Sequence, residues 1–256
     1  MRHEDVRVIV LAGDGINCEV ETAYAFSEFG VKVNIVHVAD LLNQPEILDS
    51  FHILALPGGF SFGDEISSGQ VLSLKLKYSL GDRLKKFIAD EKLIIGICNG
   101  FQVLVKLGLL PNPLNEREMS LVHNRQHHFI DQWTGLVIPK SKCVWTKSFQ
   151  LSKIDLPIRH GEGRIVFKGE SKEQEKIYQR LLSNDQIALT YEDDVNGSYQ
   201  KIAGVTDPTG KILGLMPHPE AAISKLLYPS GLDKSNEPGV GSLFFKNGIE
   251  HITLNF

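Results

Sequence analysis

The sequence predicts an α/β fold in which helices cover both faces of an open, mostly parallel sheet. Apolar segments typical of buried strands alternate with segments typical of helices, which is the pattern of repeated βαβ units. Three such strands are expected at Val6–Leu11, Val31–Val38 and Phe51–Leu56. With 256 residues, the chain has a length that one large α/β domain can accommodate.

Two helices and a fourth strand complete the N-terminal part of this pattern. A helix from about Glu19 to Phe29 follows the first strand, and Gly30 is placed to end it. A second helix is expected at Leu80–Ala89, shortly before the apolar strand Leu93–Ile97. Parallel α/β sheets bind ligands beyond the carboxyl ends of their strands, so residues that follow these strands are the first candidates for a site.

The pattern changes after Gly108, where shorter strands and turns predominate. The expected elements are strands at Phe129–Ile138, Arg164–Phe167 and Gln186–Tyr191, a helix at Lys172–Leu182, an antiparallel hairpin of Ile202–Thr206 and Ile212–Met216, and a terminal helix at Leu243–Ile249. We expect a single domain over residues 1–256, with a loop-rich C-terminal extension from about residue 229.

Composition argues against several classes of function. The net charge of −4 and an isoelectric point near 6.1 give no electrostatic reason to expect binding to nucleic acid or to an anionic membrane. The cysteines Cys18, Cys98 and Cys143 have neither disulfide-framework nor zinc-site spacing, so no metal ligands are predicted. No apolar run has the length of a membrane span, and none at the start is typical of a signal peptide. We therefore expect a reduced, cytoplasmic protein.

Cys98 is the strongest candidate for a reactive residue. It lies where the expected strand Leu93–Ile97 gives way directly to a helix, and this is the arrangement of a nucleophile elbow. Gly96 and Gly100 lack the Cβ atoms that would crowd so tight a turn. The start of a helix also favours a thiolate over a thiol. Taken alone, the cysteine leaves acyl transfer, redox chemistry and plain core packing open, and a lone cysteine is more often a buried core residue than a catalyst.

A base and an acid follow the predicted hairpin. His218 and Glu220 are two residues apart, so in an extended segment their side chains point to the same side. Pro217 and Pro219 restrict the backbone on either side of the histidine. An imidazole held beside a carboxylate is what a Cys–His–Glu triad requires, although the pairing with Cys98 cannot be inferred from spacing.

The segment Pro57–Asp64 offers an oxyanion site. Gly58 and Gly59 follow a strand, and glycines there let backbone N–H groups approach a substrate oxygen. The second donor would be the N–H of Asn99, directly after the nucleophile. The segment lacks the Gly-Lys-Ser/Thr ending of a phosphate-binding loop.

Three segments together resemble the class I glutamine amidotransferases: Pro57–Asp64, Gly96–Gln102 and Met216–Glu220. The Asn99-Gly100 pair is similar to that of the glutaminase subunits of phosphoribosylformylglycinamidine synthase. The resemblance extends from the first strand to Glu220 and implies a flavodoxin-like sheet in three layers. It departs from the family at Ala221, where arginine is common, and at residues 124–126, which lack a serine.

The resemblance assigns roles to individual residues. It implies that Cys98 is the nucleophile, His218 the base and Glu220 the acid that orients it. Gly59 and Asn99 are expected to form the oxyanion hole. The residues expected to contact the substrate are Gln102, Gly58 and Phe60.

The implied activity is hydrolysis of glutamine to glutamate and ammonia. The ammonia would pass to a large synthase subunit that makes formylglycinamidine ribonucleotide in purine synthesis. No cofactor is expected on this chain, while ATP and Mg would be bound by the synthase subunit; whether a small third subunit takes part is open. Two other functions remain: a stand-alone thiol hydrolase such as a γ-glutamyl peptidase, and a non-catalytic regulatory module.

Overall fold

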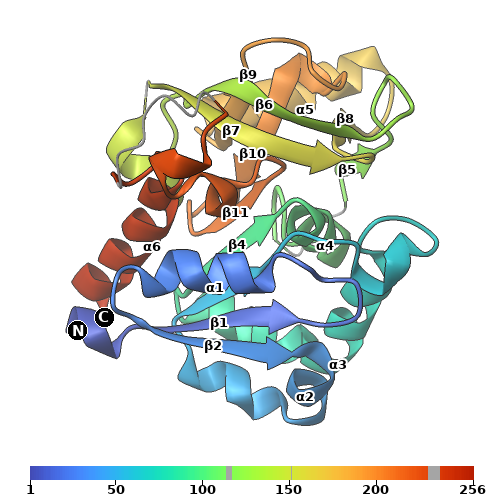
Figure 1. Cartoon of the computed structure of the whole chain (residues 1–256). Coiled ribbons are helices and arrows are strands. Elements are labelled where there is room, and N and C mark those ends of the chain that lie inside the picture. Colours follow the sequence, from blue (N-terminus) through green and yellow to red (C-terminus); the bar gives the residue numbers. More distant parts are fainter. Residues whose placement is uncertain (114–116, 151, 230–236) are drawn as a thin grey trace.

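The computed structural model describes residues 1–113, 117–150, 152–229 and 237–256. Within these ranges, nine strands form one sheet in the order β2-β1-β3-β4-β11-β10-β9-β6-β7 (Figure 1). Their bounds are β1 (Arg7–Ala12), β2 (Lys32–His37), β3 (Ile53–Leu56), β4 (Leu93–Ile97), β6 (Ile130–Val137), β7 (Lys153–His160), β9 (Ile187–Tyr191), β10 (Ile202–Thr206) and β11 (Ile212–Leu215). Two further strands, β5 (Met119–Val122) and β8 (Arg164–Phe167), form a separate antiparallel pair.

The sheet has a parallel half and an antiparallel half. Strands β2, β1, β3, β4 and β11 run parallel to one another. Strands β10, β9, β6 and β7 continue the sheet in antiparallel fashion. The predicted α/β class is therefore confirmed, and so is the predicted β10–β11 hairpin. Because β11 runs parallel to β4, the segments after both strands meet at one edge of the sheet.

The helices lie on both faces of the sheet. They are α1 (Glu19–Ser27), α2 (Val38–Asn43), α3 (Gln70–Ala89), α4 (Asn99–Leu107), α5 (Ser171–Ser183) and α6 (Ser242–Asn255). Helices α1 and α6 contact each other on one side, and α3 contacts both α2 and α4 on the other (Figure 1).

An aromatic cluster attaches the C-terminal helix to the core. The ring of Phe26 in α1 packs edge-on against Trp145, at a centroid distance of 6.5 Å, and against Phe245 in α6, at 4.9 Å. The indole N–H of Trp145 donates to the carbonyl of Lys211 at 3.1 Å. The terminal helix predicted at residues 243–249 is thus confirmed, and it continues to Asn255.

Helix α2 and strand β5, both short, are not among the predicted elements, and α3 and β7 also differ from the sequence-based expectation. Helix α3 begins at Gln70 rather than at Leu80, because Leu72 and Leu76 are also buried and extend the apolar stripe by two turns. Strand β7 is not among the predicted strands, since Pro157 lies in its middle. As β7 is at the edge of the sheet, it pairs only with β6, where a proline is tolerated.

The C-terminal extension predicted from about residue 229 falls mainly on residues 230–236, which lie outside the described ranges. Among the helices in the described ranges, none combines the length and the apolar character needed to cross a lipid bilayer.

Candidate active site

Cys98 occupies a strained turn between β4 and α4. Its backbone has φ 49° and ψ −104°, a conformation that non-glycine residues rarely adopt. A Cβ on Gly100 would overlap the carbonyl oxygen of Leu56, so the turn can form only with glycine there. The thiol is 5% exposed, and its Sγ lies 3.5 Å from the carbonyl oxygen of Arg159. The structure therefore has the elbow geometry that the sequence predicted.

His218 and Glu220 form a buried pair after β11. Nδ1 of His218 and Oε1 of Glu220 are 2.5 Å apart, and the side chains are 3% and 2% exposed. The backbone N–H of His218 donates to the carbonyl of Pro157 at 2.8 Å, which joins the segment after β11 to β7. Burial disfavours the imidazolium, but the Glu220 carboxylate and the neighbouring Cys98 raise the pKa of His218 well above its usual value.

The three residues predicted as a triad are close together in the structure. The side chains of both Cys98 and Cys18 interact with the imidazole of His218. Nε2 of His218 and Oε2 of Glu220 are buried and have no hydrogen-bond partner among the described residues. A base whose outer nitrogen is free, beside a thiol, can take the thiol proton.

The predicted oxyanion segment lies against the loop that follows β1. Gly59 has φ 142°, and a Cβ there would lie 2.7 Å from the carbonyl oxygen of Gly15. The N–H of Phe60 donates to that same carbonyl at 2.7 Å, whereas the N–H of Gly59 has no partner among the described residues. Asn99 is the first residue of α4, where backbone N–H groups also lack intrahelical partners. Both predicted donors are therefore available.

The side chains of Asn99 and Gln102 are used within the protein. The amide nitrogen of Asn99 donates to Oε1 of Gln102 at 2.9 Å, and its Oδ1 accepts from the N–H of Ser61 at 3.2 Å. Nε2 of Gln102 donates to the carbonyl of Glu162 at 2.5 Å. The sequence predicts that Gln102 contacts substrate, and this stays a prediction; in the structure its amide joins α4 to the segment after β7.

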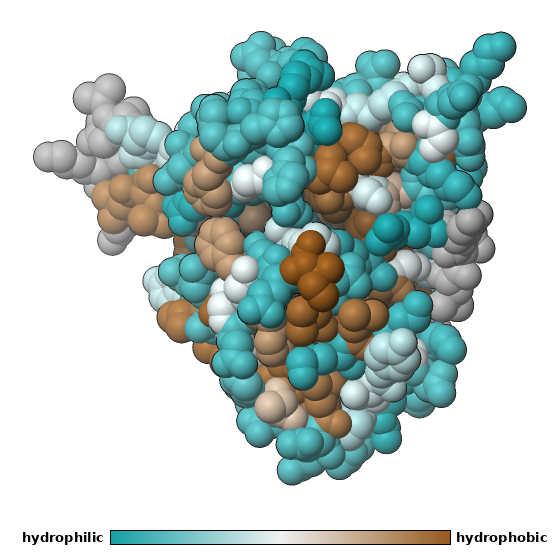
Figure 2. Space-filling model, turned by 90° about the vertical axis from the view of Figure 1, so that its right-hand side faces the viewer, coloured by the Kyte–Doolittle hydropathy of each residue, from teal (hydrophilic) through white to brown (hydrophobic). Residues whose placement is uncertain are grey.

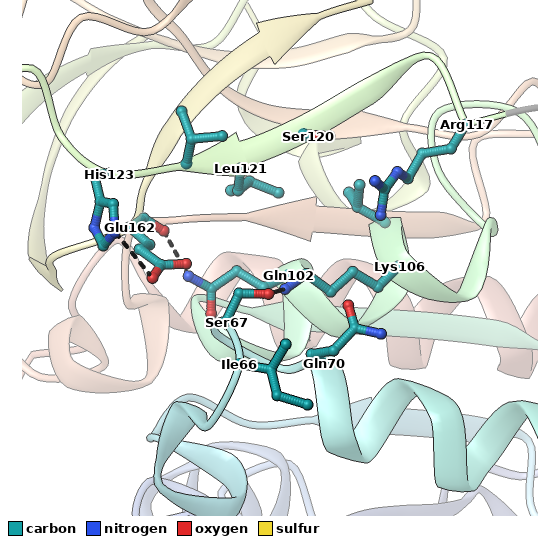
Figure 3. A pocket seen from close by; sticks show the side chains of 12 residues that line it. Ile66, Ser67, Gln70, Gln102, Lys106, Arg117, Ser120, Leu121, His123 and Glu162 are labelled. Atoms are coloured by element: carbon teal, nitrogen blue, oxygen red, sulfur yellow. Dashed lines mark hydrogen bonds and ion pairs between the residues drawn. The ribbon is translucent and has the colours of Figure 1, made fainter.

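A cavity of about 290 Å³ opens beside Gln102 (Figure 3). Nζ of Lys106 lies 2.5 Å from the hydroxyl of Ser67, and its burial lowers the pKa of the ammonium. The carboxylate of Glu162 lies 3.7 Å from Nε2 of His123. The remaining lining residues are Ile66, Gln70, Val105, Arg117, Ser120, Leu121 and Val122. The cavity thus presents cationic groups and one carboxylate close together.

One face of the molecule is partly hydrophobic. Figure 2 shows apolar residues in the middle of this face, surrounded by hydrophilic ones. The exposed rings of Phe60 and Phe129 lie 6.2 Å apart, and Ile66 is 87% exposed. Exposed apolar groups of this size next to a site are typical of contact surfaces.

Two residues near the site have no role assigned in the sequence analysis. His160 ends β7 and is buried, with Nδ1 3.0 Å from Oδ1 of Asn124. Burial, together with the charge of His218, lowers the pKa of His160 to about 4. Cys18 follows β1 and lies beside His218. The signal that could have indicated Cys18 is its position after the carboxyl end of a parallel strand.

Comparison with known proteins identifies the family of the chain. The family model of the CobB/CobQ-like glutamine amidotransferase domain matches residues 5–252. The chain belongs to this family. The expectation of a glutamine amidotransferase enzyme is therefore confirmed.

Curated relatives show which members of the family the chain resembles in sequence. The phosphoribosylformylglycinamidine synthase subunit PurQ of Methanococcus maripaludis is 41% identical over 238 residues, covering 87% of this chain and 85% of the relative. The subunit of the same name from Dehalococcoides mccartyi is 36% identical over 251 residues, covering 96% and 97% of the two chains. The amidotransferase described here thus belongs with these synthase subunits.

Solved structures give the same result for the fold. A chain in the structure of PurLQS from Thermotoga maritima aligns with a TM-score of 0.75 at 30% identity, covering 97% of this chain and 99% of that one. A glutamine amidotransferase from the same organism aligns with a TM-score of 0.59 at 17% identity, covering 98% and 99%. The second likeness shows only that the amidotransferase fold is shared.

Proposed function

We propose that this protein is the glutaminase subunit of a phosphoribosylformylglycinamidine synthase. It hydrolyses glutamine to glutamate and supplies the ammonia to a synthase subunit in purine biosynthesis. The observation that carries the proposal is the strained elbow of Cys98 next to the buried pair of His218 and Glu220. The relatives at up to 41% identity support the assignment to this synthase.

The first half-reaction forms a thioester. His218 takes the proton of Cys98, and the thiolate attacks the carboxamide carbon of glutamine. The N–H groups of Gly59 and Asn99 would stabilise the oxyanion of the tetrahedral intermediate, where negative charge develops. His218 then gives its proton to the departing nitrogen, and ammonia leaves a glutamyl thioester on Cys98.

The second half-reaction releases glutamate. Water that gives a proton to His218 attacks the thioester, and the thiolate of Cys98 is the leaving group. In both halves an imidazolium forms, and the carboxylate of Glu220 stabilises it and keeps the ring in one orientation. No metal or organic cofactor is required on this chain for these steps.

The cavity beside Gln102 is proposed to hold the amino-acid end of glutamine. Its cations, Lys106 and Arg117, suit the α-carboxylate, and the carboxylate of Glu162 suits the α-ammonium. Gly58 and Phe60 would contact the substrate near the carboxamide, and Gln102 would hold Glu162 in place through its main chain.

The proposed partners are a large synthase subunit, which would bind ATP and Mg, and a small third subunit. The similar chain from Thermotoga maritima comes from the structure of PurLQS, and this supports such an assembly. The exposed apolar side chains of Phe60, Ile66 and Phe129 beside the site would be covered in it. Assembly in the cytoplasm fits the expected location of purine synthesis.

The proposal is tested by measuring glutaminase activity of the purified chain with and without the synthase of the same cell. We expect weak activity alone and strong stimulation by the synthase. Equal, high turnover without a partner would instead favour a stand-alone thiol hydrolase. Failure of a glutamine-analogue electrophile to label Cys98, with or without the synthase, would favour a non-catalytic module.

A further inference from the structure

Cys18 places a second thiol beside the catalytic pair. Its backbone N–H donates to the carbonyl of Gly58 at 3.3 Å, which joins the loop after β1 to the oxyanion segment. Cys18, His218 and Glu220 each offer one possible ligand atom, and these three atoms lie within 4.8 Å of one another. The thiol is partly accessible to solvent, whereas the other two side chains are almost fully buried. The proposed mechanism gives this thiol no task.

The thiol faces the Nδ1 edge of the imidazole. The point where a Cβ on Gly58 would lie is 3.3 Å from Sγ of Cys18, 2.7 Å from Cε1 of His218 and 3.4 Å from Nδ1 of His218. Sγ of Cys18 and the ring of His218 therefore both pack closely around Gly58. Oε2 of Glu220 is buried without a hydrogen-bond partner among the described residues, so this carboxylate has an unused acceptor.

We propose that Cys18, His218 and Glu220 form a binding site for one zinc-like divalent cation, and that a cation bound there inhibits the enzyme. Thiolate, imidazole and carboxylate are the side chains that such ions prefer. One thiolate, one carboxylate and a neutral imidazole balance the charge of a divalent ion, which is favourable in a buried site. A fourth coordination position remains for water.

Small side-chain movements suffice for coordination. Metal–ligand distances of about 2.0–2.3 Å put two ligands of a tetrahedral ion about 3.5 Å apart. Nδ1 of His218 and Oε1 of Glu220, now 2.5 Å apart, would have to separate, and Sγ of Cys18 would have to approach them from at most 4.8 Å. The ion would take the place of the proton between the two buried groups, and the base could then no longer serve Cys98.

A proton is released when the ion binds. The thiol of Cys18 loses its proton, and the proton between Nδ1 of His218 and Oε1 of Glu220 moves to Nε2, while no atom is oxidised or reduced. Burial raises the pKa of Cys18, so its thiol is protonated before the ion arrives. The titratable groups facing His218 are Cys18, Cys98, Glu220 and His160. Affinity for the ion should therefore rise with pH.

Binding is tested with Co²⁺ on the full-length Cys98→Ala protein, in which the nucleophile cannot contribute a ligand. We expect one ion per chain, with a thiolate-to-cobalt charge-transfer band. The band should disappear in Cys98→Ala/Cys18→Ser and in Cys98→Ala/Cys18→Ala. Persistence of the band in both double variants would overturn the proposal, and so would absence of the band from Cys98→Ala itself.

Inhibition is tested with Zn²⁺ on the proteins that keep Cys98, assembled with the synthase. Zinc should inhibit glutamine hydrolysis by Cys18→Ser at least about tenfold less strongly than by the wild type, because one ligand is lost. Equal inhibition of the two would contradict the inhibitory role. This second test rests on the proposed function, while the cobalt titration does not, so the two can fail separately.

Discussion

The backbone N–H of Cys98 donates a 2.8 Å hydrogen bond to the carbonyl of Leu215. Leu215 is the last residue of β11, and His218 follows it by three positions. Because β4 and β11 are parallel neighbours, the segments carrying the nucleophile and the base leave the sheet side by side. Sheet register, and not proximity in the chain, therefore aligns the two reactive side chains.

Replacing Glu220 by glutamine should reduce kcat by at least about a hundredfold. The amide keeps the size of the side chain but removes the charge that raises the pKa of His218. The imidazolium that forms in both half-reactions is then less stable. Steady-state kinetics of the reconstituted complex check this, and a kcat within twofold of the wild type would show that Glu220 has no such role.

Gly58→Ala should nearly abolish glutamine hydrolysis without unfolding the protein. The new Cβ would lie 2.7 Å from Cε1 of His218, so the imidazole must move away from Cys98. Gly81→Ala in α3 is the matched control, because its Cβ meets no atom within 4 Å. The control should keep full activity and gain about 0.5–1 kcal/mol of stability. Full activity of Gly58→Ala would disprove the close packing around the base.

Lys106→Met should raise the KM for glutamine and leave kcat within about twofold. A charge-assisted hydrogen bond to the α-carboxylate contributes roughly 1.5–3 kcal/mol, equivalent to a KM increase of about ten- to a hundredfold. Lys77→Met, at an exposed position of α3, is the control and should leave KM unchanged. If the KM of Lys106→Met for glutamine equals that of the control variant, the cavity does not bind the amino-acid end of the substrate.

Because of His160, the folded protein should be less stable in mild acid than at neutral pH. Its pKa falls from the ordinary 6.5 to about 4, so between these values the unfolded chain binds a proton that the folded protein excludes. Stability is therefore lost as the pH decreases, by about 2 kcal/mol between pH 7 and pH 5. Urea unfolding at both pH values should show a smaller loss for His160→Gln than for the wild type. An equal loss would mean that His160 is not excluded from protonation.

Much of the site could be predicted because its residues lie in short, local patterns. The elbow of Cys98 needs only a strand, a cysteine between two glycines and a helix, and all of these are local in the sequence. The hairpin before His218 has an equally local turn signal. The α/β class followed from the alternation of apolar segments.

The walls of the site could not be predicted, since they depend on tertiary contacts. The carbonyl groups of Pro157 and Arg159 contact His218 and Cys98, but a strand that contains a proline gives no clear sequence signal. Asn124 lies in the segment 124–126, where the sequence departs from the family. In the structure, the side chain of Asn124 holds His160 in place. Cys18 reaches His218 only because β1 and β11 end at the same edge of the sheet.

The most direct test of the account uses Cys98→Ala in the reconstituted synthase, with amidine formation measured from glutamine and from ammonia. Removal of the thiol abolishes thioester formation but leaves the synthase partner intact. The variant complex should lose glutamine-dependent synthesis and keep ammonia-dependent synthesis at the wild-type rate. Sustained glutamine-dependent synthesis by Cys98→Ala would contradict the role of Cys98 as the nucleophile.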